Sequence, residues 1–142
     1  MLTIVTGPPC VGKTTYVRQH AEPGDIIIDL DDLITALGGN SHDPSPAVLR
    51  VAQAARVTAI RSATICHRDG APVWVIDTSP PAWLRARYRA SGGQIIELTD
   101  TAGVLHQRAA DAGRPARIHK VIDDCLAGRR TGDAAAAGGR IW

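Results

Sequence analysis

The segment Gly7–Thr15 constrains the fold of this chain more than any other part of the sequence. It reads Gly-Pro-Pro-Cys-Val-Gly-Lys-Thr-Thr and fills every fixed position of G-x-x-x-x-G-K-[ST], the phosphate-binding P-loop. This motif works between a buried strand and the start of a helix. Leu2–Thr6 before it is suited to a short buried strand, and Thr14–His20 after it contains no proline or glycine. The sequence therefore predicts a strand–loop–helix unit that binds phosphate.

The residue types of this loop explain how it would hold a phosphate. Gly7 and Gly12 permit turns that a Cβ atom would block, so that successive backbone N–H groups point at one anion. The start of the following helix adds about half a positive charge. We expect Lys13 to reach the β- and γ-phosphates and the Thr14 hydroxyl to bind Mg²⁺. The predicted nucleotide-binding residues are Gly7, Pro8, Pro9, Cys10, Val11, Gly12, Lys13, Thr14 and Thr15.

The length and composition predict one domain with a short tail. A chain of 142 residues is typical of a single domain, and with no Phe its core must consist of Val, Ile, Leu and Ala. We place the domain at residues 1–128. Residues 129–142 are rich in Gly and Ala and predict a flexible tail, whose final Ile141–Trp142 would dock on a surface that the sequence does not identify. The formal charge of +2 permits contact with nucleic acid without arguing for it.

The cysteines and histidines do not form a known metal or catalytic spacing. Cys10, Cys66 and Cys125 are far apart and odd in number, so neither a disulfide framework nor a metal site is expected. We interpret Cys10 as a small filler of the loop, and the five histidines as surface residues. No signal peptide or membrane-spanning run is recognisable, because Gly7–Pro9 interrupts the first apolar stretch. We therefore expect a cytoplasmic location.

The alternation of apolar runs and helical segments predicts an α/β protein with a doubly wound parallel sheet. The expected strands are Leu2–Thr6, Ile26–Asp29, Val73–Asp77 and Gln94–Leu98. The expected helices are Thr14–His20, Asp31–Leu37, Pro46 to about His67, Pro80–Ala90, Thr99 or Asp100 to about Ala112, and Arg117–Ala127. Ligands of such sheets bind at the edge formed by the carboxyl ends of the strands.

Acidic residues follow the second and third strands at that edge. Asp31 is the candidate base that would accept a proton from a phosphoryl acceptor, and Asp29 would orient water on Mg²⁺ or support Asp31. Asp32 would only cap a helix, and capping is the alternative for all three acids. Asp77 ends a run of four apolar residues, the form of a Walker-B strand, and is predicted to bind Mg²⁺ directly or through water. Thr78 would contact the acceptor or cap the next helix.

Arginines are concentrated near the predicted break at residues 113–116. Arg108, Arg114 and Arg117 flank this break, and we interpret residues 106–117 as a mobile lid. Lid arginines close over a transferring phosphate and neutralise its charge, so Arg108 and Arg114 are candidate catalytic residues. A second basic cluster, residues 85–89, would touch a phosphate on the acceptor. For both groups the alternative is a solvated helix face.

Together these features resemble the small P-loop kinases, above all the kinase domain of phage-type polynucleotide 5′-kinases. The resemblance rests on the P-loop, the segment Ile27–Ile34, the strand ending in Asp77 and the late arginine-bearing helix, and covers about residues 1–127. It implies a kinase-like P-loop NTPase fold with three α/β/α layers and about four parallel strands in the core order 2-3-1-4. It also implies use of ATP or another NTP with Mg²⁺, with Asp31 matching the general base and Lys13 and Thr14 the nucleotide contacts.

The chain also departs from that group. Ile34 stands near the position of an arginine for the acceptor phosphate, and the residue four after Arg108 is Ala112 rather than a second lid arginine. Asp29-Leu30-Asp31 resembles the D-x-D of shikimate-type kinases, although their Gly-Gly-Gly acceptor motif is missing. An arginine-rich lid also suits nucleoside monophosphate kinases. The acceptor therefore stays open.

We predict an ATP-dependent phosphotransferase that moves the γ-phosphate to a hydroxyl of a nucleic-acid 5′ end or of a nucleoside or nucleotide. The alternatives are a small-molecule or nucleoside monophosphate kinase, a P-loop NTP hydrolase, and a nucleotide-binding module that acts through a protein partner. No membrane partner is expected. The sequence determines neither the preferred base of the nucleotide nor the oligomeric state.

Overall fold

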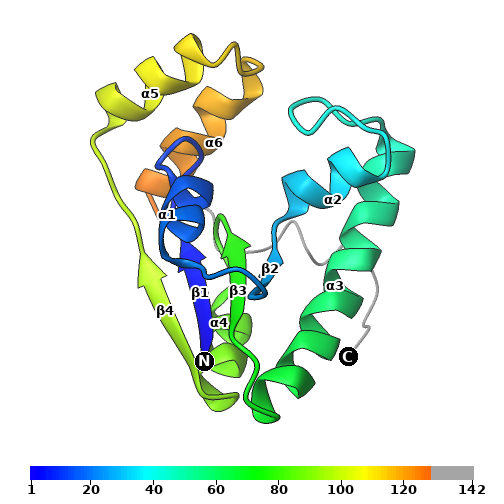
Figure 1. The fold of residues 1–142 in the computed structure, drawn as a ribbon. Helices are drawn as coiled ribbons and strands as arrows, with labels where there is room; N and C mark the ends of the chain where they lie inside the picture. Colours follow the sequence, from blue (N-terminus) through cyan, green and yellow to red (C-terminus); the bar gives the residue numbers. More distant parts are fainter. Residues whose placement is uncertain (129–142) are drawn as a thin grey trace.

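The computed structural model describes residues 1–128, which form a four-stranded parallel sheet with helices on both faces (Figure 1). The predicted tail at residues 129–142, with Ile141–Trp142, lies outside the described residues. The strands are β1 (Leu2–Thr6), β2 (Ile26–Ile28), β3 (Val73–Asp77) and β4 (Gly93–Glu97). The helices are α1 (Lys13–His20), α2 (Leu30–Ala36), α3 (Pro46–Arg68), α4 (Ala82–Ala90), α5 (Ala102–Asp111) and α6 (Arg117–Leu126).

The strand order is β2-β3-β1-β4, as the resemblance to P-loop kinases implies. β1 lies in the centre, where Ile4 pairs with Val75 of β3 on one side and with Ile95 of β4 on the other. Every residue of β1 is buried, because helices cover both faces of a central parallel strand. The sheet therefore places the loop that follows β1 at the middle of its carboxyl edge.

Two apolar clusters attach the helices to the sheet. On one face, Ile60 and Ala63 of α3 and Tyr88 of α4 pack with β-strand residues that include Ile4 and Val75. On the other face, α1 supplies Val17, which packs with Val5, Trp74 and Ile76. α3 and α4 thus form one layer and α1 the other, so that the predicted three-layer α/β/α arrangement is present.

A third cluster attaches α5 and α6 to the P-loop. Leu105 and Ala109 of α5 and Ile122 of α6 are buried together, and the loop residues Cys10 and Val11 pack against them. Two histidines also join these helices, because the Nδ1 atoms of His106 and His119 lie 2.7 Å apart. These histidines therefore form part of a helix–helix contact, which their interpretation as surface residues did not include.

The element boundaries differ from the expected ones by a few residues at most. β2 ends at Ile28 and not at Asp29, because Asp29 is the N-cap of α2 and its side chain accepts a hydrogen bond from the Asp31 N–H group. Thr101, rather than Thr99 or Asp100, caps α5. Both differences arise from side-chain capping of a helix start, which competes with strand pairing or with a neighbouring cap.

No helix within residues 1–128 combines the length and the apolar character that crossing a membrane would require.

Candidate functional site

The P-loop has a backbone conformation that suits glycine at its fixed positions. Gly7 has φ 145°, and a Cβ atom at this position would lie 2.2 Å from the carbonyl oxygen of Leu98. Gly12 has φ 94° and is the N-cap of α1. Cys10, although not a glycine, has φ 63°, a strained conformation that often accompanies functional loops. The loop is therefore held tightly between β4 and the first turn of α1.

The start of α1 offers backbone donors to an anion. Within the described part of the chain, no side chain caps this helix and its first turn contains no acid. The first N–H groups of a helix have no partner inside the helix, and the helix dipole favours negative charge there. Such a start suits a phosphate group.

The Lys13 side chain folds over the P-loop. Its Nζ atom donates to the carbonyl oxygens of Gly7 and Pro8, both at 2.8 Å. Burial lowers the pKa of Lys13 to about 8, while nearby groups, chiefly Cys125 and Asp29, oppose this shift. Lys13 is thus a desolvated cation at the centre of the loop, for which a phosphate is a suitable partner.

Thr14 and Asp29, two of the predicted Mg²⁺ ligands, are in direct contact. The Thr14 Oγ1 atom donates a hydrogen bond to Asp29 Oδ2 at 2.9 Å, and Asp29 is 7% exposed. Hydroxyl and carboxylate oxygens are the donors that Mg²⁺ prefers. Among residues 1–128, no group of three or more His, Cys, Asp or Glu side chains could hold a metal. A Mg²⁺ ion at this pair would therefore need phosphate or water oxygens, as is usual in phosphoryl-transfer sites.

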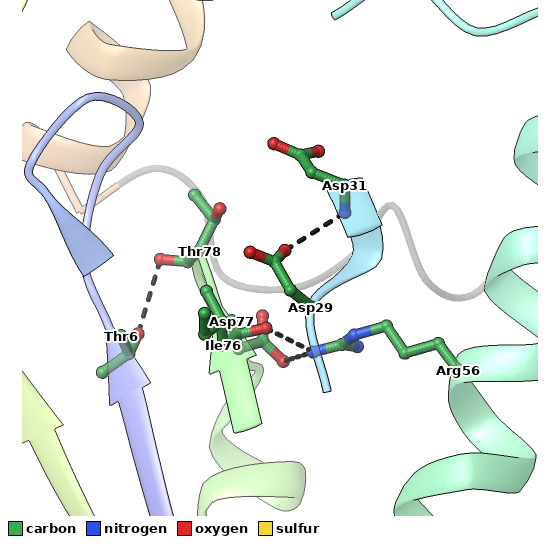
Figure 2. Close-up of polar contacts among 7 residues, drawn as sticks. All are labelled: Thr6, Asp29, Asp31, Arg56, Ile76, Asp77 and Thr78. Carbon is green, nitrogen blue, oxygen red and sulfur yellow. Dashed lines mark hydrogen bonds and ion pairs between the residues drawn. The ribbon is translucent and has the colours of Figure 1, made fainter. Parts of the chain in front are cut away.

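Asp77, the third predicted Mg²⁺ ligand, forms an ion pair with Arg56 of α3 (Figure 2). Arg56 Nη2 lies 3.0 Å from Asp77 Oδ2 and also donates to the carbonyl oxygen of Ile76. Both side chains are largely buried. Burial lowers the pKa of Arg56, but Asp77 and other nearby groups together outweigh this effect, and the net shift of the pKa is upward. The structure thus gives Asp77 a protein partner that the sequence analysis did not identify.

Asp31 stands at the start of α2, next to Asp29. In Figure 2 its side chain points away from the Arg56–Asp77 pair. Burial raises the pKa of Asp31, and the charge of Asp29 adds to this effect. Arg114 and Lys13 are close enough to oppose the shift electrostatically. A partly buried carboxyl group that feels the positive charges of Lys13 and Arg114 suits the role of a proton acceptor.

The two candidate lid arginines belong to α5 and to the segment between α5 and α6. Arg108 forms an ion pair with Asp100 at 3.1 Å and donates to the carbonyl oxygen of Cys10 at 3.4 Å. Arg114 lies within electrostatic reach of Asp31, and its Nε atom is buried without a hydrogen-bond partner among residues 1–128. The structure therefore brings Arg108 to the P-loop and Arg114 toward the candidate base.

Arg117 connects the start of α6 to a segment distant in sequence. Its guanidinium group pairs with Asp43 at 2.9 Å and donates to the carbonyl oxygen of His42. Asp43 and His42 belong to the segment between α2 and α3.

Within the second basic cluster, Arg85 pairs with Glu97 at 3.1 Å, and Tyr88 is buried in the core. That cluster lies on α4 and is not part of the site described here.

Arg56 is the main site residue that the sequence analysis missed. Its only sequence signal is an arginine inside an otherwise small and apolar stretch of α3, between Ala55 and Val57. Since 21 residues separate Arg56 from Asp77, spacing alone could not relate the two.

Comparison with known proteins supports the fold. A sequence family described as an AAA domain matches residues 2–97. The structure is similar to a chain in "Structure of the Pnkp1/Rnl/Hen1 RNA repair complex", with a TM-score of 0.65 and 15% sequence identity over 93% of the present chain. The match covers 46% of that longer chain, and at this identity it shows the fold alone. No curated protein matches this chain in sequence.

Proposed function

This chain belongs to the AAA domain family, and on that premise we propose that it is an ATP-dependent phosphotransferase acting on a hydroxyl group. The acceptor would be a nucleic-acid 5′ end or a nucleoside or nucleotide. The observation that carries the proposal is the position of Asp31, within electrostatic reach of both Lys13 and Arg114. A hydrolase needs only a positioned water, whereas a carboxylate opposite the P-loop suits removal of a proton from an alcohol.

In this proposal the P-loop binds the triphosphate. The N–H groups of the loop and of the start of α1 would surround the phosphates, and Lys13 would exchange its two carbonyl partners for phosphate oxygens. Thr14 and Asp29 would hold Mg²⁺, which when bound neutralises phosphate charge. Asp77 would act on this ion through water while it remains paired with Arg56. The other P-loop residues would contribute backbone contacts.

Asp31 would accept the proton of the acceptor hydroxyl. Its raised pKa makes it a better proton acceptor than an exposed carboxylate, and the positive charges of Arg114 and Lys13 keep its ionised form accessible. Arg114 and Arg108 would stabilise charge on the transferring phosphoryl group and help to exclude water. Because Asp31 must be ionised to act, we expect transfer to decline as the pH falls through its raised pKa.

Two observations bear on the nature of the acceptor. The structural neighbour comes from an RNA repair complex, which favours a nucleic-acid end over a small hydroxy acid. Ile34, at the position where an arginine for the acceptor phosphate was expected, is buried and cannot contact a substrate. Arg114, whose positive charge opposes the rise in the pKa of the candidate base, is the arginine that could replace it.

The test is transfer of labelled γ-phosphate from ATP to a panel of oligonucleotides, nucleosides, nucleotides and small hydroxy acids. We expect Lys13→Ala and Asp31→Asn each to reduce transfer by at least ~100-fold, since each removes charge stabilisation or the base. Asp32→Asn is the matched control, because Asp32 is exposed and lies 3.7 Å from Arg18. Its transfer rate should change less than about twofold.

The alternatives give different results in the same assay. ATP turnover that is indifferent to every acceptor would identify a hydrolase. ATP binding without turnover would identify a nucleotide-binding module. Transfer that persists in both Lys13→Ala and Asp31→Asn would refute the proposed site.

A further inference from the structure

The two helices of one layer carry an unusual excess of positive charge. α3 and α4 pack on the same face of the sheet, and neither helix contains an Asp or Glu residue. Their arginines are Arg50, Arg56, Arg61, Arg68, Arg85, Arg87 and Arg89. Surface helices of soluble proteins usually mix both signs of charge, so this layer calls for an explanation other than solubility.

Two of these arginines pair with carboxylates of the sheet. Arg56 pairs with Asp77, and Arg85 pairs with Glu97. Three of the other arginines, namely Arg61, Arg68 and Arg87, line one groove of about 200 Å³ between α3 and α4. We call this the α3–α4 groove. Its remaining lining residues are Ile60, Thr64, Ile65, Leu84, Tyr88 and Ser91.

The groove lies at the opposite edge of the sheet from the P-loop. Its α3 residues lie in the carboxyl-terminal half of that helix, which ends just before β3 begins, and Ser91 of the lining lies between the end of α4 and the start of β4. The P-loop instead follows the carboxyl end of β1. Figure 1 shows these ends of α3 and α4 at the far end of the sheet from α5 and α6. The groove is therefore separate from the site of the proposed transfer reaction.

Exposed apolar side chains accompany the arginines. Trp83, which is 53% exposed, lies one helical turn before Arg87 on the same side of α4. Ile65, which lines the groove, is 60% exposed. An exposed indole provides a surface on which a base can stack, and guanidinium groups bind phosphate oxygens. Neighbouring cationic and aromatic side chains are typical of surfaces that bind single-stranded nucleic acid.

We propose that the α3–α4 groove binds single-stranded nucleic acid. Arg61, Arg68 and Arg87 would contact successive phosphates, and Trp83 would stack on a base. Charge alone would also attract an acidic protein segment, but the exposed Trp83, one turn from Arg87 on α4, favours a strand that carries bases. This inference does not depend on the transfer reaction.

The first test measures binding of a fluorescein-labelled oligothymidylate by anisotropy, without nucleotide and at increasing salt concentration. We expect the triple variant Arg61→Gln, Arg68→Gln, Arg87→Gln to bind at least ~30-fold more weakly. Its slope of log affinity against log salt should be smaller by about 2, since each phosphate contact to a single strand contributes about 0.7. The matched control, Arg50→Gln with Arg89→Gln, changes exposed arginines of the same helices outside the groove lining and should stay within about twofold.

Two further variants test whether base stacking and the P-loop site contribute to the affinity for the oligonucleotide, apart from the charge of the groove. Trp83→Ala should lower the affinity about tenfold, and it gives a result even if the triple variant fails to fold. Lys13→Ala should bind the oligonucleotide as well as the unmodified protein does, whatever its effect on transfer. The inference fails if the unmodified protein does not bind, or if Lys13→Ala or the control pair loses as much affinity as the triple variant. It also fails if polyglutamate competes as well as the oligonucleotide.

Discussion

The charge of Lys13 depends on its surroundings, and this dependence should be measurable. Because burial lowers the pKa of Lys13 to about 8, the free protein loses this charge as the pH rises through that value. We expect the affinity for ATP to fall by up to about tenfold between about pH 7 and about pH 9, since one pH unit above its pKa only about a tenth of an amine remains protonated. Calorimetric titration with ATP checks this.

Lys13→Arg is the control for this prediction, because its guanidinium remains charged throughout the range. Its affinity should be lower than that of the unmodified protein but nearly constant with pH. A flat profile for the unmodified protein would show that Lys13 remains protonated, contrary to the effect of burial.

Removing one partner of the Arg56–Asp77 pair should destabilise the protein more than replacing both partners. The two side chains are 17% and 15% exposed, so Asp77→Leu would leave a buried guanidinium group without its partner. We expect this variant to lower the free energy of unfolding by about 3–5 kcal/mol, measured by chemical denaturation. The double variant Arg56→Met, Asp77→Leu should recover most of the loss, because it removes both charges.

Glu97→Leu offers a comparison for that pair, since Glu97 also bonds an arginine of the same layer but is 64% exposed. Its effect should stay below about 1 kcal/mol. Equal losses in Asp77→Leu and Glu97→Leu would mean that burial of the Arg56–Asp77 pair has little energetic consequence.

At the scale of secondary-structure elements, the P-loop depends on the close approach of β4. A methyl group on Gly7 would lie 2.2 Å from the Leu98 carbonyl oxygen, and backbone atoms cannot move away without disturbing the pairing of β1 with β4. We expect Gly7→Ala to lower the affinity for ATP by at least ~10-fold and to destabilise the protein by more than about 2 kcal/mol. ATP titration and denaturation measure the two effects.

Gly103 gives the opposite expectation. It lies inside α5, its φ is not positive, and a Cβ atom there would meet no heavy atom within 4 Å. Gly103→Ala should therefore raise the free energy of unfolding by about 0.5–1 kcal/mol through helix propensity. If both substitutions had the same effect, local crowding at Gly7 would not be the reason for the glycine there.

At the scale of the whole molecule, the domain boundary at residue 128 remains a prediction. Residues 1–128 contain the apolar clusters that join the sheet to its helices. We therefore expect a chain that ends at Gly128 to unfold within about 2 °C of the full chain and to bind ATP with the same affinity. Thermal denaturation and ATP titration test this, and a large loss of either would place residues 129–142 within the domain.

Much of the fold could be predicted because its determinants are local. Continuous apolar runs, glycines after helices and capping side chains identified all four strands and all six helices of the described chain. The predicted boundaries were wrong where one residue could belong to either of two elements. Asp29, for example, could end the strand or cap the helix, and it caps α2. The strand order came from the resemblance to P-loop kinases and not from residue spacing, because pairing between distant strands has no local signal.

The sequence by itself determined that a phosphate-binding loop joins the first strand to the first helix, because that motif is contiguous and each position in it has a steric or electrostatic reason. It also supplied the candidate acids and arginines. Only the tertiary structure decided their partners: Thr14 with Asp29, Asp77 with Arg56, and Asp31 within reach of Arg114. Charge interactions depend on distance and burial, and both exist only after the sheet has brought separate segments to one edge.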